Sequence, residues 1–140
     1  MAPHQSAYEP LETRSSETER IAAQVLVLHL KRFRWSATGL RSKLTTTVTC
    51  PAHHLDVSRY QSAMCKAHPH TYHLYGVTNH VGVMGGGHYT ATCLNPGDQQ
   101  WYHFNDQLVL KARPPVATPS AYILFYCMAE DPANPQCPQD

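Results

Sequence analysis

The sequence has little charge, and its charges nearly cancel. Only 15% of the 140 residues are Asp, Glu, Lys or Arg, and the formal net charge is +1. A surface that binds nucleic acid needs clustered positive charge, so we expect no nucleic-acid partner.

Long apolar runs are also lacking, because the longest purely aliphatic stretch is residues 25–28. That stretch is far too short for a membrane span, and residues 1–19 have no apolar core like that of a signal peptide, so we expect no membrane partner.

The chain also lacks the paired cysteines of a disulfide framework. Its five cysteines are odd in number and irregularly spaced, at Cys50, Cys65, Cys93, Cys127 and Cys137. A secreted, disulfide-stabilised domain more often has an even set. These residues are better explained as reduced thiols in a cytoplasmic and/or nuclear protein.

Metal-binding patterns are missing as well. Histidines are frequent, and a zinc site built from His68, His70 and His73 is conceivable. Structural zinc usually takes cysteine pairs or histidines at helical spacing, and neither pattern is present. We therefore expect no metal and no cofactor.

The 140 residues suffice for one modest domain between two polar ends. Residues 1–20 contain Ser, Thr and Glu without an apolar period, which predicts a disordered lead. Residues 130–140 hold three prolines and no apolar pattern, which predicts a disordered tail. The domain itself is therefore expected at residues 21–129.

Several stretches between these ends have the composition of strands. Residues 25–30 are apolar on both faces, which predicts a central strand with a buried His29, and Lys31 and Arg32 mark where it emerges into solvent. Residues 111–120, with three prolines, are expected to be a linker. Further strands are expected at residues 72–80, 89–94, 99–105 and 122–128.

The most informative stretch is Gly-Gly-Gly-His-Tyr-Thr-Ala at residues 85–91, which is followed by a turn at residues 95–98. Pro and Gly in the centre of this turn favour type II, and paired residues on the flanking strands then have numbers that sum to 193. His88 then faces Asn105 with Cβ atoms about 4.5–5.5 Å apart, within reach of a side-chain hydrogen bond. The opposite face is expected to be the buried one; it carries Tyr89, Ala91, Tyr102 and Phe104.

A histidine held by an asparagine is two-thirds of a thiol-protease site. The imidazole of His88 would take a proton from a cysteine, and the amide of Asn105 would fix the tautomer and orientation of the ring without adding a charge. Asp106 is adjacent and could assist or substitute, although strand alternation would point it to the opposite face. A strand-end or turn role is the competing interpretation of Asp106.

Five segments of the chain resemble, in the same order, motifs of the ubiquitin-specific proteases, a family of papain-like cysteine deubiquitinases. They are residues 25–33 (VLVLHLKRF), 72–80 (YHLYGVTNH), 85–91 (GGGHYTA), 101–106 (WYHFND) and 121–126 (AYILFY). The resemblance implies an α+β papain-like cysteine protease fold, and it identifies residues 21–129 with the C-terminal part of the catalytic domain. The chain would form mainly the antiparallel β-sheet of the palm, with loops.

The resemblance also implies a function. The family hydrolyses the isopeptide bond after the C-terminal glycine of ubiquitin, so ubiquitin or ubiquitinated proteins are the expected partners. Residues 81–87 are expected to be a mobile loop over the ubiquitin tail, and residues 34–43 are either a second such loop or an ordinary solvated hairpin. The substrate-binding residues expected on this basis are Gly85, Gly86, Gly87 and Tyr89. The catalytic residues expected are His88, Asn105 and Asp106.

The nucleophile of the family is missing. Its cysteine lies in an N-terminal box with Gly, Asn and Thr ahead of it, and none of the five cysteines here has that setting or precedes residues 25–33. We therefore expect the chain alone to be inactive, with an apolar sheet face and unpaired edges exposed. Two interpretations stay open: a deubiquitinase segment that supplies the His and Asn of a Cys-His-Asn site, and a non-catalytic remnant or splice form that at most binds ubiquitin or a partner.

Overall fold

The computed structural model describes residues 23–61 and 71–129 of the chain. The expected lead at residues 1–20 and the expected tail at residues 130–140 lie outside the described residues. Within the described part, helical structure is limited to the 3₁₀ turn η1, Ser58–Tyr60. No helix there has the length and apolar character needed to cross a membrane.

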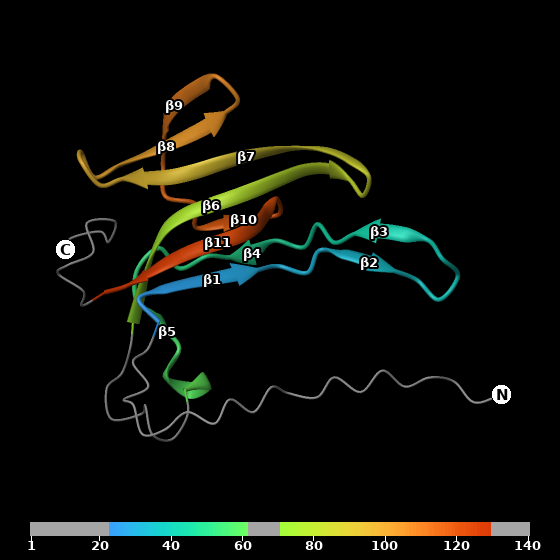
Figure 1. Cartoon of the computed structure of the whole chain (residues 1–140), viewed down its shortest axis with the longest axis horizontal. Helices are drawn as coiled ribbons and strands as arrows, with labels where there is room; N and C mark the ends of the chain where they lie inside the picture. The colour runs from blue at the N-terminus through green and yellow to red at the C-terminus, as the bar shows by residue number, and fades with distance from the viewer. Residues whose placement is uncertain (1–22, 62–70, 130–140) are drawn as a thin grey trace.

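Strand β6, Thr71–Val83, is the longest element and lies inside a seven-stranded sheet in which every pairing is antiparallel. The strand order is β1, β11, β6, β7, β8, β9, and β5 pairs with the start of β6 (Figure 1). The other bounds are Val25–His29 for β1, Leu55–Asp56 for β5, Gly86–Asn95 for β7, Gln100–Asn105 for β8, Leu108–Ala112 for β9 and Ala121–Met128 for β11. The chain therefore forms the antiparallel sheet that the sequence predicts.

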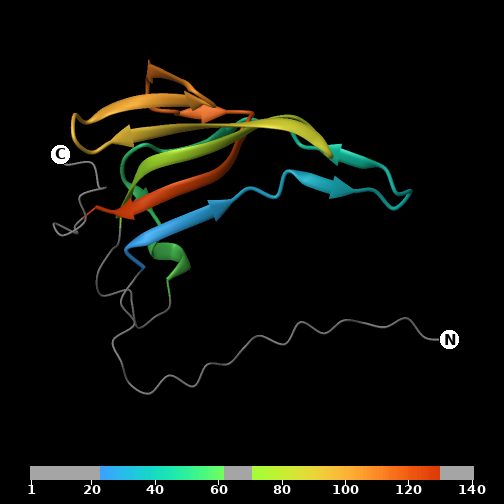
Figure 2. The same cartoon turned by 45° about the horizontal axis from the view of Figure 1, so that its top comes forward.

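Two small sheets accompany the main one. Strands β2, Phe33–Trp35, and β3, Arg41–Lys43, form a hairpin that projects beyond the main sheet (Figures 1 and 2). Strand β4, Val48–Thr49, pairs with β10, Ala117–Thr118. Residues 34–43 thus have the shape of a hairpin.

One face of the main sheet forms the hydrophobic core. Leu74 and Val77 of β6 are buried there beside Tyr126 and Leu124 of β11, because directly paired residues point to the same side of a sheet. Full burial of such side chains stabilises the fold by about 1.5–3 kcal/mol each. The segments around β4 and β5 pack against this face with Cys50, Val48, Leu55 and Val57.

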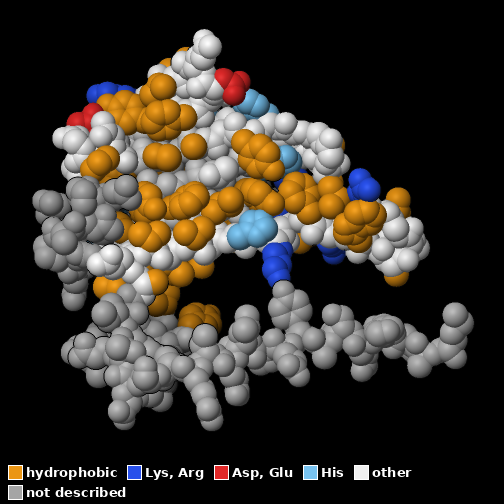
Figure 3. Space-filling view, viewed as in Figure 1, with side chains coloured by type: hydrophobic (Ala, Val, Ile, Leu, Met, Phe, Trp, Pro, Cys, Tyr) orange, Lys and Arg blue, Asp and Glu red, His pale blue; other side chains and the backbone are white. Residues whose placement is uncertain are grey.

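Parts of the other face of the sheet are exposed among the described residues, although His80, on the same side as Tyr89, is buried. Val27 of β1 is 51% exposed, and Val109 of β9 is 50% exposed. Figure 3 shows hydrophobic side chains gathered in a broad band across the molecule. The exposed apolar side chains on this face are Val25, Val27, Tyr89, Phe104 and Val109. The expectation of an exposed apolar sheet face is confirmed.

The prediction that residues 25–30 form a central, doubly buried strand is wrong. Strand β1 lies at the edge of the sheet and pairs only with β11 among the described strands. His29 is exposed rather than buried in a core, and its ring meets the edge of Tyr122 at a centroid distance of 4.7 Å. Apolar residues on both faces of a strand indicate that both faces are suited to burial, and they carry no information about its neighbours in the sheet.

The prediction of a mobile loop at residues 81–87 is also wrong. Strands β6 and β7 stay paired along this stretch, and the turn between them is only Met84 and Gly85. A Cβ atom on Gly82 would lie 2.7 Å from the Cα atom of Gly87 on the neighbouring strand, so any larger residue there would force the two backbones to shift. The glycines therefore permit close contact between two paired strands, and their number is no sign of a loop.

Strand β9 is an element that the sequence did not indicate. A two-residue turn, Asp106 and Gln107, joins it to β8, and Asp106 has a φ of +51°. Leu108, Val109 and Leu110 are each about half exposed, so they lack the apolar–polar alternation by which a half-buried strand is identified. The linker expected at residues 111–120 includes the end of β9 and all of β10.

Arg32 was expected in solvent at the end of β1, but only 3% of its surface is exposed. Its guanidinium donates hydrogen bonds to four backbone carbonyls and to no described carboxylate. The acceptors are the carbonyls of Ala121, Leu44 (2.9 Å), Thr46 (2.9 Å) and Thr118 (3.4 Å). A buried cation is tolerated only when its donors are satisfied, so this carbonyl cage fixes three chain segments relative to one another.

We expect Arg32→Met to lower the free energy of unfolding by about 3 kcal/mol, because four carbonyls lose their donor while the aliphatic volume is kept. The matched control is Arg34→Met, since Arg34 is exposed and its guanidinium, among the described residues, bonds the Ser42 hydroxyl alone, at 3.1 Å. The control should change the free energy of unfolding by no more than about 0.5 kcal/mol. Urea unfolding of the two variants is the measurement, and equal losses would contradict a structural role of the cage.

Candidate active site

The hairpin of β7 and β8 sets the geometry of the candidate site. Its strands pair Leu94 with Trp101 and Ala91 with Phe104, so paired numbers sum to 195 and the predicted sum of 193 is wrong by two. The turn holds four residues, 96–99, instead of two. The side chain of Asn95 accepts a hydrogen bond from the Gly97 amide at 3.0 Å, which is an Asx-turn that the composition did not reveal.

A shift of two residues leaves every side chain on its predicted face, because the side-chain period of a strand is two. The assignment of the buried face is nevertheless wrong. Tyr89 is 54% exposed and Phe104 is 38% exposed, whereas Thr92 and Trp101 on the opposite face are buried at 7% and 9% exposure. The core segments around β4 and β5 cover the face of Trp101, which sequence alternation could not indicate.

His88 and Asn105 meet as predicted, although they are not directly paired. His88 pairs with Val81 of β6, and Asn105 is the last residue of β8. The Nε2 atom of His88 lies 2.6 Å from Oδ1 of Asn105. An amide oxygen can only accept, so Nε2 of the neutral imidazole carries the proton and Nδ1 keeps its lone pair. The ring is thereby prepared to accept a proton at Nδ1.

Asp106 lies close to the same imidazole. Its Oδ2 atom is 3.8 Å from Nε2 of His88, so the prediction that it points to the opposite face is wrong. Asp106 is a turn residue with a φ of +51°, and strand alternation does not apply to it. The side chains of His88 and Asp106 are 47% and 78% exposed, so water weakens their electrostatic interaction in this chain.

An aromatic cluster lies beside the site on the other face of β6 and β7. The ring of His80 is 4.7 Å from that of Tyr89 and 5.2 Å from that of Phe33, and Phe33 is 5.8 Å from Tyr122. Of this group, only Tyr89 is among the residues predicted from the sequence. Phe33, His80 and Tyr122 all lie in the recognisable motif segments, and this was the only signal that could have identified them.

The buried ring of His80 leaves room only for a glycine at position 87, directly before His88. His80 is 4% exposed, and burial, with a smaller contribution from the charge of Lys43, lowers the pKa of its imidazole. The neutral ring lies against β7 where a Cβ atom on Gly87 would collide with its Nε2 atom. The Nζ atom of Lys43 donates to the backbone carbonyl of His80 at 2.5 Å. Gly87 therefore keeps His88 close to β6.

The other predicted glycines have different surroundings. Gly85 is in the turn with a φ of +93°, and Gly86 begins β7. No described atom lies within 4 Å of a Cβ built on either residue, so both face open space. The structure thus brings Tyr89 and Gly87 to the site's surroundings, and it leaves Gly85 and Gly86 at the tip of the hairpin.

Neither a metal site nor a nucleophile is found among residues 23–61 and 71–129. No group of three or more His, Cys, Asp or Glu side chains there is arranged to hold a metal ion, and His68 and His70 lie outside the described residues. Burial raises the pKa of the thiols of Cys50 and Cys93, which keeps both in the unreactive thiol form. Cys50 belongs to the hydrophobic core.

We expect the Nε2–H proton of His88 to exchange with water about fivefold more slowly in the chain than in Asn105→Ala, as follows from a hydrogen bond worth about 1 kcal/mol. Imidazole ¹H–¹⁵N NMR measures this exchange. Gln100→Ala is the matched control, because it removes an exposed amide side chain at the opposite end of β8 from Asn105 and should leave the His88 signal unchanged. Equal exchange in the chain and in Asn105→Ala would mean that the bond is not populated in solution.

The chain matches known proteins over most of its length. A family model described as ubiquitin carboxyl-terminal hydrolase matches residues 21–126. Human ubiquitin carboxyl-terminal hydrolase 2 is 45% identical over 113 residues, which cover 79% of this chain and 18% of that relative. Ubiquitin carboxyl-terminal hydrolase 5 of Arabidopsis thaliana is 41% identical over 109 residues, which cover 77% of this chain and 12% of that relative. The chain thus spans less than a fifth of the length of either relative.

Solved structures share the fold. A chain of the yeast SAGA DUB module with an Sgf73 variant matches with a TM-score of 0.67 at 34% identity, over 75% of this chain and 25% of that chain. A chain of the SAGA Ubp8/Sgf11/Sus1/Sgf73 DUB module bound to ubiquitin aldehyde gives the same TM-score of 0.67 at 34% identity, over 75% and 24%. The antiparallel sheet is the palm-type region of such domains. The chain belongs to the ubiquitin carboxyl-terminal hydrolase family of cysteine-type deubiquitinases.

Proposed function

We propose that this chain supplies the histidine and asparagine of a Cys-His-Asn site that hydrolyses the isopeptide bond after the C-terminal glycine of ubiquitin. The observation that carries the proposal is the 2.6 Å contact between Nε2 of His88 and Oδ1 of Asn105. This contact leaves Nδ1 as the basic atom, and proton transfer from a thiol requires such an atom. Family membership supplies the reaction, and the geometry supports the two roles.

The reaction needs a cysteine from the larger part of the hydrolase that these 140 residues do not span. Nδ1 of His88 takes the thiol proton, and the thiolate attacks the carbonyl carbon of the ubiquitin glycine. His88 then returns the proton to the departing lysine amine, which leaves ubiquitin joined to the enzyme as a thioester. Water, deprotonated by His88, hydrolyses this thioester and restores the thiol.

The remaining predicted residues have supporting roles in this proposal. Asp106, 3.8 Å from His88 Nε2, stabilises the imidazolium once it forms and is a second partner of the ring. Gly87 and Tyr89 flank His88 along β7, where an extended ubiquitin tail would pass, and Gly85 and Gly86 lie further along the same hairpin at its tip. The solved neighbours include modules bound to ubiquitin aldehyde and to monoubiquitin, which supports ubiquitin as the partner.

The absence of any disulfide among Cys50, Cys93 and Cys127 supports a reducing, cytoplasmic or nuclear compartment.

A non-catalytic remnant that binds ubiquitin or a partner is the second candidate function. Its support is that no described cysteine lies beside His88, while a broad apolar face is exposed. Both candidates predict an intact His88–Asn105 contact, so only a test of catalysis separates them.

The test transfers the palm segment into human ubiquitin carboxyl-terminal hydrolase 2, with the matched residues of that enzyme replaced by those of this chain. The chimera should cleave a fluorogenic ubiquitin substrate. His88→Ala should lower kcat about 10⁴-fold and Asn105→Ala about 10²-fold, because the first removes the base and the second only its orientation. KM should stay nearly unchanged in Asn105→Ala.

Asp98→Asn, at the far turn of the same hairpin, is the matched control and should keep full activity. A folded chimera that binds ubiquitin and shows no turnover would favour the remnant. An Asn105→Ala variant with normal kcat would remove the role proposed for Asn105.

The chain alone should form no adduct with ubiquitin that carries a C-terminal thiol-reactive electrophile. The reason is that the thiols of Cys50 and Cys93 are held protonated by burial. Mass spectrometry of the mixture is the measurement, with the active chimera as the positive control. An adduct on any cysteine that disappears in His88→Ala would show that the chain contains its own nucleophile.

A further inference from the structure

The β2–β3 hairpin carries positive charge that no carboxylate nearby in the sequence balances. Residues 23–55 contain no Asp or Glu, and their Lys and Arg residues are Lys31, Arg32, Arg34, Arg41 and Lys43. Arg32 is buried in its carbonyl cage, and Lys43 donates to the carbonyl of His80. The other three cations are exposed, and none of them forms an ion pair with a carboxylate of the described residues. Figure 3 shows blue and orange side chains next to one another at the end where the hairpin projects, and no red ones there.

One face of the hairpin consists of two aromatic–cation pairs. Directly paired residues point to the same side of a sheet, and β2 and β3 pair Phe33 with Lys43. Two residues further along β2, they pair Trp35 with Arg41. Successive side chains on one face of a strand are about 6.6 Å apart. The two pairs therefore follow one another with the spacing of side chains on one face of an extended peptide.

The outer pair, Trp35 with Arg41, is open to solvent. Trp35 is 59% exposed, and Leu40, directly before Arg41, is 70% exposed. The guanidinium of Arg41 lies over the indole of Trp35, with its Cζ atom 4.3 Å from the ring centroid. Stacking uses the flat face of a guanidinium and leaves its N–H edge free to bind a carboxylate through two parallel hydrogen bonds. The pair thus offers a carboxylate site next to exposed apolar surface.

The inner pair, Phe33 with Lys43, joins this face to the candidate active site. The ring of Phe33 lies 5.2 Å from that of His80, and Lys43 donates to the backbone carbonyl of His80. His80 pairs with Tyr89, the residue that follows His88. A polypeptide that lies along this face of the hairpin therefore ends beside the candidate site.

The number of cations favours an acidic peptide over other anionic partners. Nucleic acid is held through many phosphate contacts, and an anionic membrane surface attracts clusters of roughly four to eight cations. The hairpin and the residue before it offer only Lys31, Arg34 and Arg41 as exposed cations, and the formal net charge of the chain is +1. An extended peptide needs one carboxylate for Arg41 and one apolar side chain for Trp35, which this surface can satisfy.

We propose that this face of the hairpin binds an acidic, extended segment of a partner protein. A carboxylate of the segment accepts two hydrogen bonds from Arg41, and an apolar side chain on the same face of the segment packs against Trp35 and Leu40. The site goes beyond the deubiquitinase chemistry, because it uses neither His88 nor Asn105.

The first test measures the anisotropy of a fluorescent peptide, Glu-Ser-Leu-Ser-Glu-Ser-Leu, added to the 140-residue chain. When this peptide is extended, its Glu and Leu side chains alternate along one face. Binding should weaken about tenfold in Arg41→Gln, as expected for the loss of one charge-assisted pair, and by a similar factor in Trp35→Ala. A peptide with Gln in place of each Glu should also bind at least about tenfold more weakly. Equal binding of the two peptides would overturn the carboxylate site.

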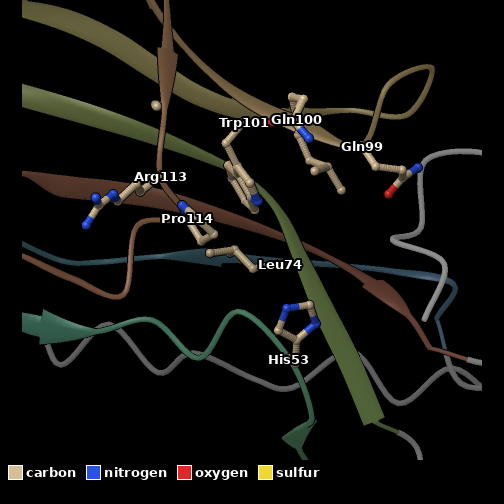
Figure 4. Close-up of a pocket in the computed structure, with 9 residues that line it drawn as sticks. His53, Leu74, Gln99, Gln100, Trp101, Arg113 and Pro114 are labelled. Carbon is tan, nitrogen blue, oxygen red and sulfur yellow. The ribbon is translucent and has the colours of Figure 1, made fainter.

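Arg34→Gln is the matched control, since Arg34 lies on the other face of the same hairpin and bonds the Ser42 hydroxyl. Arg113→Gln is a second control, near the start of β8, where Figure 4 shows the side chain of Arg113 directed away from the indole of Trp101. Both controls remove one positive charge, as Arg41→Gln does, and both should bind the peptide as the unaltered chain does. Equal weakening in all three variants would show a diffuse effect of net charge and would overturn the site.

The other anionic partners are tested with the same chain. Single-stranded DNA and vesicles of phosphatidylcholine with phosphatidylserine replace the peptide, and both should bind more weakly than it does. Tighter binding of either one, lost in Arg41→Gln, would assign the hairpin to that partner and overturn the proposal. No binding of the peptide to the folded chain at low ionic strength would overturn it as well. His88→Ala should leave peptide binding unchanged, so failure of the proposed function and failure of this site are distinguishable.

Discussion

The buried guanidinium of Arg32 holds together the end of the sheet at which the candidate site lies. It joins the segment after β1 to Leu44 and Thr46 on one side and to Thr118 and Ala121 on the other. These acceptors lie in connections and at a strand end, where sheet ladders supply few hydrogen bonds. Because a buried carbonyl without a donor is costly, one side chain determines how three separate stretches of backbone are placed.

Backbone contacts continue from this cage to the β7–β8 hairpin that carries the candidate site. Ser120, between two of the carbonyls that Arg32 binds, accepts the amide of His80 at 2.9 Å and donates its hydroxyl to Asn79 at 3.1 Å. His80 in turn lies against Gly87, which directly precedes His88. The position of His88 therefore depends on a series of packed groups that never touch its imidazole. A Cβ atom at position 87 would lie 2.6 Å from the carbonyl oxygen of Val81 on β6, so a larger residue there requires the backbone next to His88 to shift.

Predictions from the sequence were right where they depend on residues close together in the chain. Alternation along two strands places His88 and Asn105 on one face, and an error of two residues in register leaves that result intact. The register itself depends on how many residues the turn contains, and the side chain of Asn95 sets that number through a hydrogen bond. Burial of Arg32 depends on Ala121, which lies 89 residues away in the sequence. No local pattern contains such information.

Side chains on one face of β7 become more exposed from Thr92 towards the candidate site at His88. Thr92 is 7% exposed under the segments around β4 and β5, whereas the side chain of His88, on the same face four residues earlier, is 47% exposed. The described cover therefore ends before the site begins. A hydrogen bond in contact with water contributes only about 1 kcal/mol, and the same bond strengthens when water is removed. Under the proposed function, the element that brings a cysteine to Nδ1 of His88 would occupy this uncovered end. Under the proposed function, that element would also exclude water from the His88–Asn105 pair, so His88 would gain its full orientation only with the nucleophile in place.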